Sequence, residues 1–147
     1  MYMNFEQKLK IRKSLVTHGV TTSGKLFEYA NDIRKLLTLG LTDSDKLAVY
    51  DLADVVGKVN PFFDWLFKDG GKQVDLLRAL KKQGVGSAKQ LADFRADPDK
   101  FLYSGLNLDQ LKATNDLYKK VGKVNAFFDW FMGDNEAETK KVEKTEE

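Results

Sequence analysis

Hydrophobic residues recur along the chain at intervals of three and four, which is the spacing of one face of an α-helix. The apolar run over residues 5–16 ends just before Gly19, and the run over residues 74–80 ends just before Gly84. Glycine commonly follows the last turn of a helix. No stretch shows the sustained alternation of apolar and polar residues that a half-buried strand requires. The pattern therefore predicts an all-α protein.

Polar residues predict where further helices begin, because Ser, Thr, Asn and Asp side chains accept hydrogen bonds from the first N–H groups of a helix. The clearest example is Asp97 followed by Pro98, since proline favours the first helical position. Gly57 and Gly122 are expected to end the two longest helices. The predicted caps are Thr22, Asp32, Thr42, Asn60, Ser87, Asp97, Asn107 and Asn125.

The sequence repeats itself after 65 residues. Residues 56–65 match residues 121–130 at nine of ten positions, and the same register continues upstream without a gap. We therefore predict a tandem repeat of two modules, residues 1–68 and 69–133, each with four to five short helices. Residues 134–147 hold six acids and three lysines and almost no large apolar side chain, which predicts a disordered charged tail.

Each predicted module ends in a short helix rich in aromatic residues. Its apolar side chains fall on all sides of about two turns, so the core of one module cannot bury them all. We expect them to be buried between the modules or against a partner. A homo-oligomer could form through the helix of Phe62 and Trp65 and the helix of Phe127 and Trp130.

The composition excludes several kinds of chemistry. The chain of 147 residues has no cysteine and one histidine, which rules out disulfides, cysteine-ligated metals and thiol nucleophiles. That histidine, His18, aligns with Gln83 in the repeat, so a repeated histidine chemistry is absent. No pair of carboxylates recurs beside a nucleophile, and no phosphate-binding glycine loop is present. We expect no catalytic residue, no cofactor and no metal, and hence no enzyme.

No membrane span is expected, because the apolar runs at residues 61–63 and 65–67 are far shorter than the about 20 residues that a bilayer requires. Residues 1–12 carry charges where a signal peptide would have an apolar stretch. The sequence therefore predicts a cytoplasmic protein.

Polar residues present in both copies are the candidates for a shared role. Capping and the helix dipole explain most of them. Asp51 and Asp116 lie in the middle of helices and are expected to pair with Lys35 and Lys100 of a neighbouring helix.

Four residues remain as candidates for binding a protein partner. Lys58 and Lys123 have no local explanation in the sequence, and they precede the tryptophans Trp65 and Trp130. The first hypothesis is thus a non-catalytic interaction protein, such as an adaptor, an inhibitor or an assembly component, that binds through a duplicated aromatic surface.

The segment over residues 80–91 supports an alternative, nucleic-acid binding. Its Gly-Val-Gly turn between two predicted helices resembles the hairpin of helix-hairpin-helix DNA-binding modules, which implies backbone N–H groups that bind a phosphate and lysines that supply charge. Gln90 stands where that family has a small residue, and the first copy lacks the second glycine. The residues of this alternative are Lys81, Lys82, Gly84, Gly86 and Lys89.

The charge distribution does not decide between these hypotheses. The formal charge is +2 over residues 1–68, +3 over residues 69–133 and −3 over residues 134–147. The two predicted modules are therefore mildly basic, while a dedicated nucleic-acid-binding domain is normally more strongly so.

Overall fold

A computed structural model describes residues 3–68 and 70–133, and the expected tail over residues 134–147 lies outside them. The described residues form helices and no strands, which confirms the all-α prediction. The helices are α1 (Phe5–Thr17), α2 (Ser23–Ala30), α3 (Ile33–Leu37), α4 (Asp43–Val56), α5 (Pro61–Leu66), α6 (Lys72–Lys82), α7 (Ala88–Ala96), α8 (Pro98–Leu102), α9 (Leu108–Val121) and α10 (Ala126–Met132).

Every predicted cap residue precedes a helix and accepts a backbone hydrogen bond through its side chain. Asn107 and Gln110 form a complete capping box at α9, whereas Thr42 contributes only its own side-chain bond at α4. Gly57 and Gly122 end α4 and α9 with φ of 78° and 74°, a conformation that glycine adopts without strain. The local signals in the sequence therefore locate these helix ends correctly.

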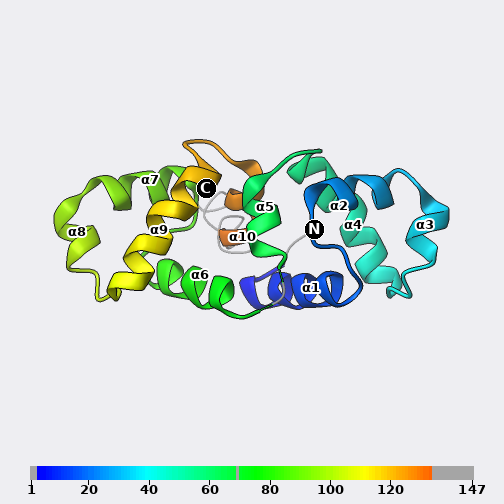
Figure 1. The fold of residues 1–147 in the computed structure, drawn as a ribbon, viewed down its shortest axis with the longest axis horizontal. Helices are drawn as coiled ribbons and strands as arrows, with labels where there is room; N and C mark the ends of the chain where they lie inside the picture. The colour runs from blue at the N-terminus through cyan, green and yellow to red at the C-terminus, as the bar shows by residue number, and fades with distance from the viewer. Residues whose placement is uncertain (1–2, 69, 134–147) are drawn as a thin grey trace, which may run out of the picture.

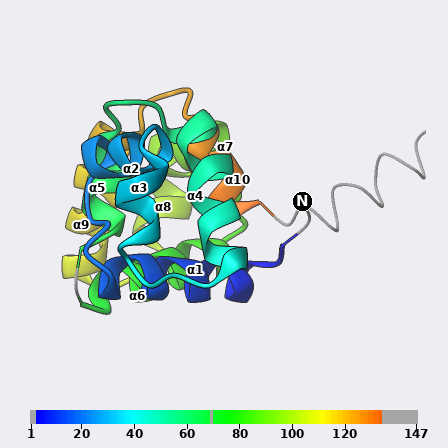
Figure 2. The ribbon, with the colours of Figure 1, turned by 90° about the vertical axis from the view of Figure 1, so that its right-hand side faces the viewer.

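The helices form an elongated molecule with α5 and α10 at its centre (Figure 1). Helices α3 and α8 lie at opposite ends, and α1 and α6 lie end to end along one long edge. The connections that lead into α5 and α10 both lie on the opposite edge, as the view turned by 90° also shows (Figure 2).

Aromatic rings of α5 and α10 pack against one another in the middle of the core. The ring centroid of Phe62 lies 5.4 Å from that of Phe127 and 5.0 Å from that of Phe128. Phe63 lies 5.5 Å from Phe127, and these four side chains are fully buried. The apolar faces that sequence reasoning offered to a second copy of the chain are therefore covered within a single chain.

The two halves of the described chain, residues 3–68 and 70–133, cross over at this centre. Helix α5 packs against α9 and α6, and α10 packs against α4 and α1. The buried apolar residues of both halves form one continuous cluster. Each half thus supplies a central helix to the core of the other, so unfolding either half would expose apolar surface of both.

Helix α1 carries two buried cations. The residue Lys8 is 0% exposed, and its Nζ donates to the carbonyl oxygens of Trp130 and Gly133. Arg12 is 7% exposed and donates to the carbonyl oxygen of Leu66 through Nε. Buried cations require such partners, because an uncompensated charge inside a protein is costly.

Candidate functional site

Trp65 on α5 and Trp130 on α10 occupy corresponding positions in the fold. Each is half-buried and stacks on the phenylalanine three residues before it in the sequence. The centroid distances are 6.0 Å between Phe62 and Trp65 and 6.1 Å between Phe127 and Trp130. Each indole also lines a pocket whose other walls come from the opposite half of the chain.

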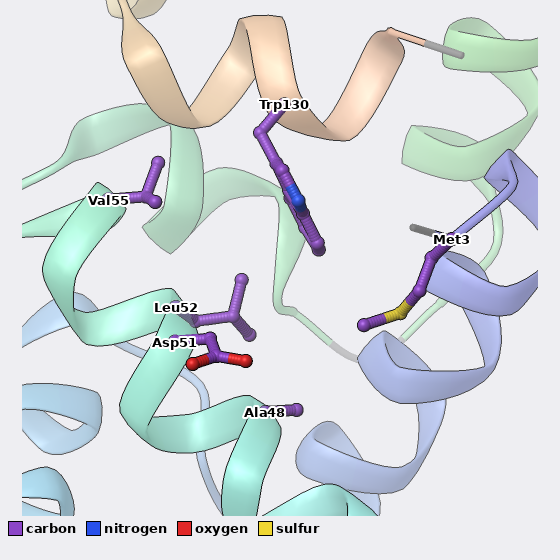
Figure 3. Close-up of a pocket in the computed structure, with 6 residues that line it drawn as sticks. All are labelled: Met3, Ala48, Asp51, Leu52, Val55 and Trp130. Carbon is purple, nitrogen blue, oxygen red and sulfur yellow. The ribbon is translucent and has the colours of Figure 1, made fainter. Parts of the chain in front are cut away.

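The pocket at Trp130 is small and mostly apolar (Figure 3). The indole extends from α10 into the space between α4 and the segment just before α1. The volume is about 160 Å³, comparable to that of an apolar cavity that admits a benzene ring. We call it the Trp130 pocket, and it is lined by Met3, Ala48, Asp51, Leu52, Val55 and Trp130.

A cation of the chain itself already lies over the Trp130 ring. The Nζ of Lys8 lies 4.8 Å from the ring centroid and is held there by its hydrogen bonds to the backbone of Trp130 and Gly133. A cation over an indole face is attracted by the negative charge density of the ring. The ring of Trp130 therefore has an internal cationic partner.

The pocket at Trp65 is wider and more polar, with a volume of about 470 Å³. Its walls come from the first half of α6 and from the beginning of α9. Ala113 lines it as Ala48, 65 positions earlier, lines the Trp130 pocket. We call it the Trp65 pocket, and it is lined by Trp65, Lys72, Gln73, Asp75, Leu76, Asn107, Asp109, Gln110 and Ala113.

Lys58 and Lys123 line neither of these pockets. Both are exposed and lie in the connections before α5 and α10. The Nζ of Lys58 lies 4.9 Å from the ring centroid of Phe27, which supplies the local explanation that the sequence did not reveal. Position 92, which corresponds to Phe27 in the repeat, is alanine and offers no ring to Lys123. The structure therefore does not bring the two lysines together with the tryptophans.

The acidic residue Asp51 has a different role from the expected one. Lys35 forms an ion pair with Glu28, and the hydrogen bond between them raises the pKa of Lys35. The expected pairing of Asp51 with Lys35 is thus wrong, because a nearer carboxylate on α2 takes the lysine. Asp51 lines the Trp130 pocket instead.

The helix-hairpin-helix-like segment uses much of its hydrogen-bonding capacity internally. The Gly86 N–H donates to Oε1 of Gln90 at 2.7 Å, and the Ala88 N–H donates to the Asp129 carboxylate at 2.6 Å. Nζ of Lys81 donates to the carbonyl oxygen of Met132 at 2.8 Å. Two amides of the turn that could bind a phosphate are thus engaged, and a carboxylate lies where an anion would bind.

Outside the hydrogen bonds of that segment, Lys82, Gly84 and Lys89 are exposed. Gly84 has φ of 86°, which explains the glycine by backbone conformation alone. These residues do not form a pocket with one another in the described part of the chain.

The chain matches no family model, no curated protein and no solved structure in comparisons with known proteins. Over residues 3–68 and 70–133, no helix is long and apolar enough to cross a membrane. The same residues contain no group of three or more His, Cys, Asp or Glu side chains arranged to hold a metal ion.

Proposed function

We propose that the chain is a tandem repeat of two helical modules that binds a protein partner, without catalysis, through the Trp65 pocket and the Trp130 pocket. The observation that carries this proposal is that two tryptophans 65 residues apart line pockets built from corresponding helices. Duplicated pockets give a partner two places to insert side chains.

Contacts that recur after 65 residues support the repeat. The Asp64 carboxylate accepts the Ser23 N–H at 2.7 Å, and the Asp129 carboxylate accepts the Ala88 N–H at 2.6 Å. Each acid lies in the first turn of a central helix and also satisfies the beginning of another helix. A contact that serves two helix termini explains why both copies have the acid at this position.

The physical character of the pockets supports a protein partner. Tryptophan is enriched among the residues that dominate binding energy at protein interfaces, where it packs against side chains in desolvated pockets. Both indoles are half-buried, so each is held by the core while part of it faces its pocket. The Trp130 pocket has the volume of one apolar side chain, and filling it would remove apolar surface from water.

The nucleic-acid alternative has weaker support. Its turn resembles a phosphate-binding hairpin, but the Gly86 and Ala88 amides donate within the chain, and Lys81 binds the Met132 carbonyl. Lys82 and Lys89 alone supply exposed charge at this segment. Two exposed lysines would make few phosphate contacts, and phosphate contacts dominate the affinity of such proteins.

Affinity capture with pocket-filling variants tests the proposal. Ala113→Phe fills the Trp65 pocket and Val55→Phe fills the Trp130 pocket, whereas Leu102→Phe adds the same ring on the exposed surface of α8. Circular dichroism would establish that all three variants fold.

We expect at least one partner protein that both wild type and Leu102→Phe retain and that a pocket-filling variant loses. The proposal would be wrong if filling both pockets left every captured protein unchanged. It would also be wrong if the captured material were nucleic acid that Lys82→Ala with Lys89→Ala releases.

A further inference from the structure

A comparison of the two indoles shows that their cationic partners differ. Lys8 lies over the Trp130 ring at 4.8 Å. The residue 65 positions later is Gln73, which lines the Trp65 pocket and carries no charge. Among the described residues, none of the cations found over aromatic rings lies over Trp65. The half-buried indole of Trp65 therefore lacks the partner that its counterpart has.

Carboxylates line the Trp65 pocket from two sides. Asp75 lies in the first turn of α6 and Asp109 in the first turn of α9. Neither belongs to an ion pair within the described part of the chain, and Lys72 is the one cation that lines the pocket with them. The charged groups at this pocket therefore favour a positively charged occupant.

The size and polarity of the pocket fit a long side chain. Its volume of about 470 Å³ is about three times that of the Trp130 pocket, at about 160 Å³. A guanidinium group stacks on an indole face and donates to carboxylates in a fixed planar geometry. The amide oxygen of Gln73 can accept one further N–H group.

We infer that the Trp65 pocket binds an arginine side chain of the partner, with its guanidinium over the Trp65 ring and paired with Asp75 and Asp109. This inference rests on the proposed function, because it names the chemistry of the group that enters one of the two docking pockets. The Trp130 pocket, whose indole is already paired with Lys8, takes an apolar side chain instead.

The test follows the indole N–H signals of both tryptophans by nuclear magnetic resonance. The probe is the peptide acetyl-Gly-Gly-Arg-Gly-Gly-amide, and the control probe has citrulline, a neutral residue of nearly the same shape, in place of arginine. We expect a saturable shift of the Trp65 signal with the arginine peptide and at least a fivefold weaker effect with citrulline. The Trp130 signal should remain in place.

Two variants of the pocket make the test specific. Gln73→Lys supplies an internal cation, as Lys8 does at Trp130, and should abolish the response. Asp75→Asn with Asp109→Asn removes the counter-charges and should also abolish it. A matched control, Asp93→Asn with Asp99→Asn, removes the same charge from α7 and α8 and should respond as wild type does.

The inference is overturned if the citrulline peptide shifts Trp65 as strongly as the arginine peptide does. It is also overturned if Gln73→Lys binds the arginine peptide normally. If either happens while Ala113→Phe still abolishes capture of a partner, the docking function stands and only the arginine is wrong. If Ala113→Phe and Val55→Phe both leave capture unchanged, the docking function itself fails.

Discussion

Lys8 and Arg12 are four residues apart on α1, and each donates hydrogen bonds to the C-terminal end of a different central helix. Lys8 reaches the carbonyl oxygen of Gly133 after α10, at 2.8 Å, and Arg12 reaches that of Leu66 in α5, at 2.7 Å. The C-terminal end of a helix carries partial negative charge, which favours cations. Residues four apart lie on one face of a helix, so α1 holds both central helices from one side.

The first prediction concerns the buried ammonium of Lys8. In Lys8→Met the apolar stem remains, but the hydrogen bonds to Trp130 and Gly133 are lost. Hydrogen bonds from charged donors contribute about 1.5–3 kcal/mol each, so we expect the free energy of unfolding to fall by about 2–4 kcal/mol. Urea denaturation measures it. Lys10→Met, at an exposed position of the same helix, should change it little, and an equal effect in both variants would contradict the prediction.

The second prediction concerns the geometry of the Arg12 guanidinium, which donates to three carbonyl oxygens. Its Nη2 lies 2.7 Å from that of Lys68 and 2.9 Å from that of Gly70, while Nε binds Leu66. A lysine at this position keeps the charge but has its donors on one atom. We expect Arg12→Lys to lose about 1–3 kcal/mol of stability. Amide hydrogen exchange should accelerate at the end of α5, and unchanged exchange there would contradict the prediction.

The helix boundaries could be predicted from the sequence because their causes are local. Asn60 and Asn125 cap helices through their own side chains, and Gly57 adopts a positive φ that few other residues tolerate. These effects depend on residues within one turn of each other. Periodicity and capping were therefore enough to establish the order of the predicted helices.

The contacts between distant segments could not be predicted in this way. Lys8 and Arg12 align with Gln73 and Leu77, so a search for residues shared by both copies removes them. Their roles depend on α1 lying beside the ends of α5 and α10, which no local pattern encodes. The two tryptophans were found because they recur, whereas Asp51 was assigned a wrong partner because the distance from Lys35 to Glu28 was unknown.

The third prediction concerns the ring contact that joins the two halves of the chain. The centroids of Phe62 and Phe127 lie 5.4 Å apart in the buried centre. Such a pair contributes about 0.5–1.5 kcal/mol beyond the area it buries. A double-mutant cycle of Phe62→Leu and Phe127→Leu should therefore show a coupling of about that size.

A matched cycle provides the control for this coupling. Phe94 is buried in the same core, but its ring packs against Phe101, at 5.6 Å. Phe62→Leu with Phe94→Leu should be additive, because the two rings share no contact. If both cycles gave the same coupling, direct ring contact could not be its source.

The last prediction concerns the pH dependence of the pair formed by Glu6 on α1 and Arg78 on α6. Two hydrogen bonds join them, one of 3.0 Å between Nη2 of Arg78 and Oε2 of Glu6. The hydrogen bond from Arg78 lowers the pKa of Glu6 from its ordinary value of 4.5. Because the pKa is lower in the folded state, the pair stabilises the fold fully above about pH 4.5, and this contribution is lost as the pH falls through the lowered pKa.

The side chains of Arg78 and Glu6 are 46% and 59% exposed, so water and salt screen the pair and its effect is small. We expect Glu6→Gln to unfold at a slightly lower urea concentration than wild type at pH 7 and low salt. The difference should vanish below about pH 3, where both states carry a protonated carboxyl at this position in wild type. Asp99→Asn, an exposed acid without an ion pair among the described residues, should show no such pH-dependent difference. A deficit of Glu6→Gln that persisted unchanged in acid would mean that its cause is packing rather than charge.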